Sequence, residues 1–381
     1  MPPPWPVLLL VRELDLGGCE RDLTKVALGL DRSRFEPHVA CFHPEGFRGE
    51  ELRGAGIPVL RLPVRSFCSP SALAGLSSMG AYLARQGIRL VHCYDVPTTI
   101  FGIPAARLFR VPVAISSLLG YRGMLPPAFR QAVRITDHLV DCLVVNCMAM
   151  RRHAVEDEKV PAHRVYLCYN GVDPRTFHPL GRQRTPPLEG ASLVVGVVCA
   201  LRAEKRVDLL VEAFAAVRHL QAGMKLAVVG SGDELPALQT LARRLGVSSD
   251  CIFQPATREV AAWLRAMDIF VLPSISEAFS NALLEAMACG CCPVGSRVGG
   301  TPELIAHGER GLLFEPGHAD EMAAQLALLI EQEPLRRRFG AAAGSFARQQ
   351  LSVDRAVRRM ESLYGALLEN GALPPPDRAR A

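Results

Sequence analysis

The segment Leu272–Glu303 reads LPSISEAFSNALLEAMACGCCPVGSRVGGTPE and decides how the rest of the chain is interpreted. It continues the strand-like run Ile269–Leu272 and leads into a pattern whose apolar residues recur at helix-face spacing. Glu277 precedes that helical pattern, and Glu285 lies inside it. A carboxylate at the carboxyl end of a strand, followed at once by a helix N-terminus, is typical of ligand sites in open α/β sheets. The segment therefore predicts such a sheet with a ligand site at its edge.

Strand-like runs alternate with amphipathic helical patterns along most of the chain, which predicts parallel sheets connected by right-handed crossovers. In the first half, the expected strands are Val7–Val11, His38–Cys41, Leu90–His92, Val113–Ser116, Leu143–Val145 and Val165–Leu167, and the expected helices are Gly18–Leu30 and Ser71–Gln86. In the second half, the expected strands are Leu193–Val198, Leu226–Val229, Ile252–Phe253, Ile269–Leu272 and Pro293–Ser296, and the expected helices are Val207–Leu220, Glu234–Leu245 and Glu259–Ala266.

The length of 381 residues exceeds that of one ordinary domain. Residues 173–190 read DPRTFHPLGRQRTPPLEG, a polar, proline-rich stretch without periodicity that is typical of an interdomain linker. We expect two doubly wound Rossmann-like α/β domains that face a cleft. The predicted organisation is an N-terminal domain at 1–175, a linker at 176–190, a C-terminal domain at 191–352, a helix at 353–370 that returns to the first domain, and a disordered tail at 371–381.

Composition narrows the class of protein. Hydrophobic residues make up 49% and charged residues 21%, which fits a globular chain rather than a disordered one. The net charge of +5 comes without a dense Lys/Arg stripe interleaved with aromatics, so nucleic acid is not an expected partner. No apolar run approaches the ~18 residues of a membrane-spanning helix. The N-terminus lacks the basic region of a signal peptide, and we expect a cytoplasmic protein.

The twelve cysteines are interpreted as reduced and mostly buried thiols. Cys289, Cys291 and Cys292 cluster, but no second Cys or His pair at metal-ligand spacing accompanies them. No metal site is therefore predicted.

Other strand ends carry residues suited to phosphate. Gly17 and Gly18 open a helix after the first strand, and Arg202 and Lys205 follow the first strand of the second half. Glycine lets backbone amides approach a phosphate, and the two cations could neutralise a pyrophosphate. A tight turn and a solvated charged loop are the alternative interpretations. Glycine turns recur at Gly230–Asp233 and Gly299–Glu303 on the same predicted edge, where Gly230 could approach a nucleotide.

The helix that begins near Phe279, Ser280 and Asn281 would present free backbone N–H groups to a sugar or a phosphate. Glu285 could accept hydrogen bonds from both hydroxyls of a ribose. A solvent-facing helical glutamate is the alternative, but the small apolar residues around it indicate a buried helix, in which a carboxylate needs a partner.

Taken together, these motifs resemble those of the family 4 retaining glycosyltransferases of the GT-B type, over nearly the whole chain. The matching stretches are GGCE (Gly17–Glu20), YNGVD (Tyr169–Asp173), LRAEK (Leu201–Lys205), VVGSGDE (Val228–Glu234), EAFSNALLE (Glu277–Glu285) and VGGTPE (Val298–Glu303). No single stretch is conclusive, whereas the full set in this order is highly specific.

The resemblance implies a role for each matching residue. Glu285 would bind the ribose, Glu277 would contact the donor sugar, and Lys205 would bind the diphosphate. It further implies that the amides near Phe279, Ser280 and Asn281 hold sugar and phosphate, that Gly17 and Gly18 face the leaving phosphate, and that Tyr169–Asp173 lies at the hinge.

Two departures from the family pattern concern charged residues. The family's arginine, five residues before the lysine, is Ala200 here, and Arg202 is the nearby candidate for the diphosphate contact. A family histidine after the strand Val113–Ser116 is replaced in the segment SSLLGYRG, near Leu118 and Leu119. His92 is interpreted as a polar residue at a strand end rather than as a substitute for that histidine, and Arg122 is a candidate acceptor-side cation.

The expected activity is transfer of a sugar from a nucleotide diphosphate sugar to an acceptor hydroxyl with retention, in polysaccharide, glycolipid or related glycoconjugate synthesis. The resemblance implies no cofactor and no metal, with Glu277, Arg202 and Lys205 as the catalytic set. A nucleotide-sugar epimerase and a non-catalytic nucleotide-sugar-binding protein are the alternatives. Tyr121–Arg134 mixes basic and apolar residues, so peripheral contact with the inner face of the membrane competes with a solvated helix edge.

Overall fold

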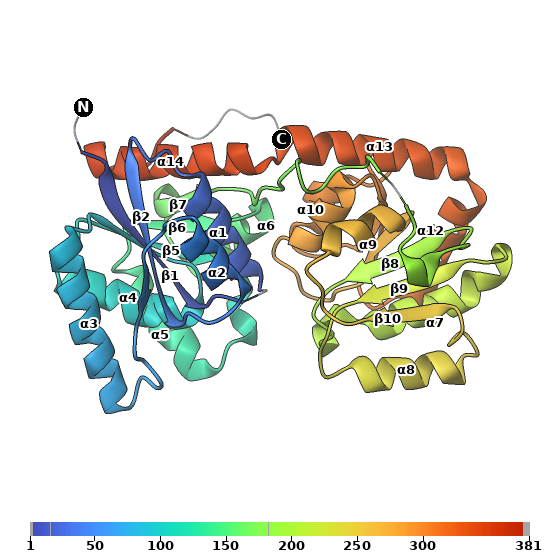
Figure 1. Ribbon diagram of the computed structural model, residues 1–381, viewed down its shortest axis with the longest axis horizontal. Helices are drawn as coiled ribbons and strands as arrows, with labels where there is room; N and C mark the ends of the chain where they lie inside the picture. Colours follow the sequence, from blue (N-terminus) through green and yellow to red (C-terminus); the bar gives the residue numbers. More distant parts are fainter. Residues whose placement is uncertain (1–2, 16, 182, 376–381) are drawn as a thin grey trace. The chain divides into compact units, whose positions relative to one another are not determined.

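The computed structural model describes residues 3–15, 17–181 and 183–375. The chain divides into two compact units, residues 1–171 with 353–381 and residues 172–352. Each unit has its own parallel sheet with interleaved helices (Figure 1). The first boundary follows Gly171 rather than residue 175. Residues 176–190, which were expected to form a linker, cluster with the second unit.

The sheet of the first unit has the strand order β3-β2-β1-β4-β5-β6-β7. Its strands are β1 (Trp5–Glu13), β2 (Phe35–His43), β3 (Val59–Arg61), β4 (Leu90–Cys93), β5 (Val113–Leu118), β6 (Cys142–Val145) and β7 (Val165–Leu167). Its α-helices are α1 (Gly18–Gly29), α2 (Phe47–Gly54), α3 (Pro70–Gln86), α4 (Val96–Leu108), α5 (Pro127–Asp137), α6 (Met148–Arg152) and α14 (Val353–Asn370). All of the strands predicted in the first half are confirmed, and β3 was not predicted.

The apolar run of β1 shows why this sheet carries helices on both faces. Val7, Leu9 and Val11 belong to the hydrophobic cluster that contains residues of α1 and α14. Leu8 and Leu10 point the opposite way, into the cluster that contains residues of α3 and α4. Successive side chains of a strand alternate between the two faces of the sheet, so a continuous apolar run is what two covered faces require.

The C-terminal helix α14 completes the first unit. Its Met360, Leu363, Tyr364 and Leu367 pack in the same cluster as side chains of α1. The prediction that this helix returns to the first domain is therefore confirmed. Leu373 also packs against this cluster, so the predicted disordered tail begins too early at 371. The final part of that tail, residues 376–381, lies outside the described residues.

The sheet of the second unit has the strand order β10-β9-β8-β11-β12-β13. Its strands are β8 (Val194–Val198), β9 (Lys225–Val229), β10 (Cys251–Gln254), β11 (Ile269–Leu272), β12 (Cys292–Ser296) and β13 (Leu312–Phe314). Its α-helices are α7 (Val207–Val217), α8 (Leu235–Arg244), α9 (Val260–Ala266), α10 (Asn281–Ala288), α11 (Thr301–Ile305), α12 (Ala319–Glu331) and α13 (Glu333–Gln350). The predicted strands of this half are confirmed, and β13 was not predicted.

Each sheet has one point where the chain order reverses between neighbouring strands. In the first unit β1 pairs with β4, and in the second unit β8 pairs with β11. Crevices outside the carboxyl ends of strands at such a point are where open α/β sheets bind ligands. The loops that follow these strands are therefore the candidates for a ligand site. No helix in the described part of the chain is long and apolar enough to cross a membrane.

Candidate functional site

Lys205 and Glu277 meet at the reversal point of the second sheet. Lys205 ends the short 3-10 turn Ala203–Lys205 after β8, and Glu277 lies in the loop after β11. Lys205 Nζ lies 2.7 Å from Glu277 Oε2, and the Ser274 hydroxyl donates to the same oxygen at 3.3 Å. The two charged side chains are 20% and 14% exposed, so both can still be reached from solvent. The structure thus brings together two residues that were predicted to act on one donor.

The pair combines a cation for phosphate with an acceptor for hydroxyls. An ammonium group has three donors, and within the described residues Glu277 is the one carboxylate that pairs with Lys205. The remaining donors of Lys205 can therefore serve an anionic ligand. The second oxygen of Glu277 can accept a hydrogen bond from a sugar hydroxyl.

Arg202 stays apart from this pair. It is the residue before the 3-10 turn, and its side chain is exposed. Its backbone carbonyl accepts the Lys205 N–H at 3.0 Å, whereas its guanidinium has no ion pair within the described ranges. Its predicted diphosphate contact stays a prediction.

Helix α10 begins at Asn281, shortly after Glu277 in the sequence. Ser280 is its N-cap, and the Ser280 hydroxyl accepts the Leu283 N–H at 3.2 Å. Phe279 and Ser280 are buried, and Asn281 is half-buried. The Ser280 side chain therefore caps the helix. The predicted contact with the donor substrate at this position would be made by backbone N–H groups of the first turn.

Glu285 lies on the buried side of α10 and is 1% exposed. The alternative of a solvent-facing glutamate is therefore wrong. Its neighbours Leu284, Ala286 and Met287 are also buried. A carboxylate buried to this degree requires polar partners.

Two glycine turns fix the loops around the pair by close backbone packing. Gly230 has φ +148°, and a Cβ there would lie 1.8 Å from the Cys199 carbonyl oxygen. Gly299 has φ +51°, and a Cβ there would lie 1.7 Å from the Glu277 carbonyl oxygen. The Gly300 N–H donates to the Ala278 carbonyl at 2.7 Å. Both turns are thus explained by contacts within the protein, and the second braces the loop that carries Glu277.

In the first unit, Gly17 and Gly18 lie at the exposed start of α1, where Gly17 is the N-cap. A Cβ at Gly17 would lie 2.0 Å from Glu20 Oε2, so the Glu20 carboxylate folds back over this helix start. Gly17 has no side chain that could complete a capping box with Glu20. The prediction at GGCE concerned its glycines, and Glu20 was not singled out.

Three carboxylates therefore surround the start of α1. Burial raises the pKa of Glu20 above its ordinary value, and the nearby charges of Glu13 and Asp95 act in the same direction, whereas its own backbone N–H and Arg12 lower it. Burial also raises the pKa of Asp95, which caps α4 by accepting the Thr98 N–H at 2.9 Å. An anionic ligand at this helix start would meet negative charge unless a proton is bound there.

We predict that Glu20→Gln changes the pH dependence of stability. Because the folded state holds its proton more tightly than the unfolded state, the contribution of Glu20 is fully present below the ordinary pKa of 4.5 and is lost as the pH rises through the folded value. The variant should therefore lose less stability than the wild type between pH 4.5 and neutrality in urea unfolding. Glu309→Gln, at an exposed carboxylate 3.8 Å from Arg310 in the second unit, is the control. Identical pH slopes in Glu20→Gln and wild type would contradict the prediction.

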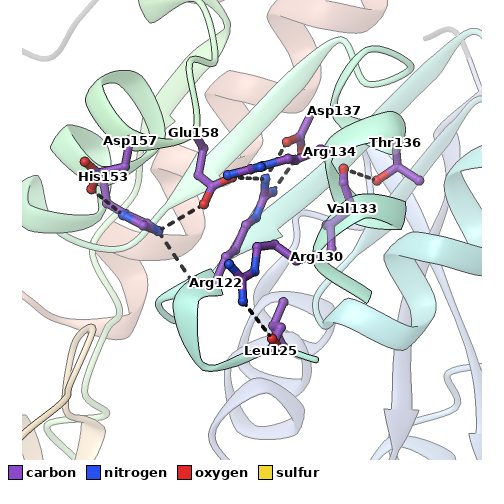
Figure 2. Close-up of polar contacts among 10 residues, drawn as sticks. All are labelled: Arg122, Leu125, Arg130, Val133, Arg134, Thr136, Asp137, His153, Asp157 and Glu158. Carbon is purple, nitrogen blue, oxygen red and sulfur yellow. Dashed lines mark hydrogen bonds and ion pairs between the residues drawn. The ribbon is translucent and has the colours of Figure 1, made fainter. Parts of the chain in front are cut away.

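The two other candidates in the first unit, His92 and Arg122, are both buried and bonded within the protein. His92 is fully buried, with Nδ1 2.7 Å from the Tyr364 hydroxyl and Nε2 2.8 Å from the Ser117 hydroxyl. Burial lowers the pKa of His92 to about 3, so it is neutral and structural. Arg122 is 2% exposed and forms a two-pronged ion pair with Asp137, so an acceptor-side cation is the wrong interpretation (Figure 2).

The segment Tyr169–Asp173 contains the boundary between the units, in agreement with its predicted position at a hinge. Lys25 of α1 donates to the Gly171 carbonyl at 2.7 Å, and Asn170 donates to Asp22 at 2.8 Å. A small cavity of about 40 Å³ lies against these residues and α14. Helix α1 therefore anchors the end of the first unit.

The cysteines do not form a metal centre. Among the described residues, no group of three or more His, Cys, Asp and Glu side chains is placed to hold a metal ion. Burial raises the pKa of Cys289 and of Cys292 to about 12, so these thiols stay protonated at neutral pH.

Comparison with known proteins agrees with this architecture. Residues 17–171 match the model of the glycosyl transferase 4-like domain, and residues 183–346 match that of glycosyl transferases group 1. The fold and the two family models define a GT-B glycosyltransferase. The chain belongs to glycosyltransferase family 4.

Three similar proteins illustrate the range of the family. The D-inositol 3-phosphate glycosyltransferase of Nocardiopsis dassonvillei is 34% identical over 312 residues, covering 75% of this chain and 72% of that protein. The N-acetyl-alpha-D-glucosaminyl L-malate synthase of Bacillus anthracis is 28% identical over 309 residues, covering 79% and 81%. The crystal structure of Anabaena Alr3699/HepE with UDP and glucose has a TM-score of 0.83 at 21% identity, covering 95% and 99%, and shares the fold.

Proposed function

We propose that this glycosyltransferase moves a sugar, with retention, from a nucleotide diphosphate sugar to an acceptor hydroxyl, and that it needs no metal ion. The observation that carries the proposal is the contact of 2.7 Å between Lys205 and Glu277 at the reversal point of the second sheet. One of these side chains suits the diphosphate and the other suits the sugar. The capped start of α10 lies directly behind them.

The difficult step is the departure of the nucleoside diphosphate. The bond from the anomeric carbon to the phosphate oxygen breaks, the bond to the acceptor oxygen forms, and the leaving phosphate takes the acceptor proton. Lys205, assisted by Arg202 and the first-turn amides of α10, would stabilise the charge that develops on the phosphate. Glu277 would orient the sugar, and Glu285 would bind the ribose hydroxyls. No protein base is required in this scheme.

The acceptor is proposed from the relatives. The names of two of them specify L-malate and D-inositol 3-phosphate, which are small hydroxyl compounds with anionic groups. We infer an acceptor of this class, within the glycoconjugate chemistry predicted from the sequence. Membrane contact through Tyr121–Arg134 stays a prediction. Its charge is reduced because Arg122 pairs with Asp137 and Arg134 pairs with Glu158.

We predict that UDP stabilises the protein in a thermal-shift assay, since a ligand at about 100 times its dissociation constant adds about 2.7 kcal/mol. Transfer is then tested with UDP-glucose and UDP-N-acetylglucosamine against L-malate and D-inositol 3-phosphate, with the product anomer determined by NMR and a chelator in parallel reactions. Conversion of the donor without an acceptor would indicate an epimerase. Binding without transfer or hydrolysis would indicate a non-catalytic protein, and loss of activity with the chelator would contradict metal independence.

A further inference from the structure

The loop between β5 and α5, residues 119–126, follows β5 at the carboxyl edge of the first sheet. Strand β5 is the neighbour of β4, so the loop lies one strand from the reversal point. Gly120 and Gly123 are exposed, and the Met124 side chain is 62% exposed. Arg122 lies between them and is 2% exposed. The loop thus presents backbone and the apolar side chains of Met124 and Pro126 outward, while it inserts a single cation into the protein.

Asp137, at the end of α5, holds that cation from one side. Arg122 Nη1 lies 2.5 Å from Asp137 Oδ2, and Nη2 lies 2.9 Å from Oδ1. This fork fixes both the position and the plane of the guanidinium. The Arg164 guanidinium donates to the Asp137 backbone carbonyl at 2.9 Å and so holds the end of α5 in turn.

Glu158 holds the cation from the other side. Its carboxylate is 4% exposed, and its Oε2 lies 3.6 Å from Arg122 Nη1 and 3.0 Å from Arg134 Nε (Figure 2). The two arginines and the two carboxylates, Asp137 and Glu158, balance in charge. This balance explains how two carboxylates can be tolerated with so little exposure.

A π-helical turn at His153–Asp157 brings Glu158 to this position. The Glu158 N–H donates to the His153 carbonyl at 3.1 Å, which is the five-residue bond of a π turn. Residues five apart would diverge around an α-helix, whereas here His153 Nε2 lies 3.8 Å from Glu158 Oε1. Turns of this kind are rare and frequently occur at functional sites.

His153 adds a second contact to the loop. Its ring meets the Tyr121 ring edge-on, with the centroids 4.9 Å apart, and its Nε2 lies 3.5 Å from the Arg122 backbone N–H. Its Nδ1 is held by Asp157 at 2.7 Å. The loop is therefore held at two adjacent residues, at Tyr121 through its ring and at Arg122 through both its backbone and its side chain.

We propose that Arg122 is a positioning residue that sets the conformation of residues 119–126, and that this loop forms part of the acceptor site. The proposal rests on the proposed transfer reaction. Buried ion pairs are weak evidence for stability, and selecting one conformation is a better-supported use of them. Binding residues commonly lie on exposed loops that a rigid scaffold holds in place, and the buried contacts of Arg122 hold this loop in that way.

The test is Arg122→Lys, which keeps the charge and loses the fork. With the acceptor that supports transfer by the wild type, L-malate or D-inositol 3-phosphate, the KM for the acceptor should rise about 10- to 100-fold, the scale of a small misplacement of binding groups. The dissociation constant for UDP should not change. Hydrogen exchange of residues 119–126 should become faster.

Two further variants keep the outcome decisive. Arg107→Lys alters an arginine that pairs with Asp141 at 2.8 Å just before β6, at the opposite edge of the same sheet, and should leave the acceptor KM unchanged. Glu158→Gln keeps an oxygen acceptor and removes one charge. It should raise the acceptor KM as Arg122→Lys does, and it provides the test if Arg122→Lys folds poorly. An unchanged acceptor KM in both Arg122→Lys and Glu158→Gln, or an equal rise in Arg107→Lys, overturns the proposal. A wild type that neither binds UDP nor transfers sugar removes the proposed function itself.

Discussion

Lys205→Ala is expected to lower turnover at saturating donor by about ten- to a thousandfold, the range for loss of one preorganised group that stabilises developing charge. Lys205 Nζ is held 2.7 Å from Glu277, so its position is set before any ligand arrives. Negative charge develops on the leaving diphosphate as the transition state forms, and it is absent from that oxygen in the bound donor. The loss should therefore fall on kcat as well as on kcat/KM, measured as release of UDP in the presence of acceptor.

Lys225→Ala is the matched control. Lys225 begins β9 and pairs with Asp250 at 2.9 Å, at the opposite edge of the same sheet. It has a similar exposure, 28% against 20%, and a similar partner, so general effects of losing a lysine ion pair should appear in both variants. Normal turnover in Lys205→Ala, or an equal decrease in Lys225→Ala, would show that Lys205 does not stabilise the leaving group.

Most of the fold could be predicted because its strands are long enough to carry a pattern. The run Val7–Val11 is apolar at every position, since both faces of its sheet are covered. In contrast, strands of three residues offer too few positions for a periodicity: of the three such strands at sheet edges, β7 was predicted, whereas β3 and β13 were missed. The returning helix α14 was predictable from its amphipathic pattern, whereas its partner helix follows from tertiary packing alone.

The candidate site was predicted unevenly, for a related reason. Lys205 and Glu277 are 72 residues apart. They meet because β8 and β11 are neighbours in the sheet, and this strand order cannot be seen in the sequence motifs themselves. Arg122 was misjudged because its burial depends on its ion pairs with Asp137 and Glu158. Glu158 reaches Arg122 through a π turn, which has no sequence signature. Glu20 was missed because its N-cap, Gly17, has no side chain and GGCE therefore lacks the capping-box pattern.

Gly299→Ala is expected to affect both stability and activity, and it tests whether the turn after β12 braces the Glu277 loop. A non-glycine residue in the left-handed region costs about 1–2 kcal/mol. At this position the added Cβ would also lie 1.7 Å from the Glu277 carbonyl oxygen, which is backbone and cannot rotate away. The loop that carries Glu277 must therefore move. The free energy of unfolding should decrease by more than the conformational cost, and kcat should fall with it.

Gly317→Ala separates these two contributions. Gly317 has φ +87°, and a Cβ there meets nothing within 4 Å. This variant should lose only the conformational cost of about 1–2 kcal/mol in urea unfolding and should keep the wild-type kcat. If Gly299→Ala instead matched Gly317→Ala in both measurements, the Glu277 loop would tolerate displacement and Gly299 would be an ordinary turn residue. If Gly299→Ala lost stability but kept kcat, the contact would brace the fold without positioning Glu277 for the reaction.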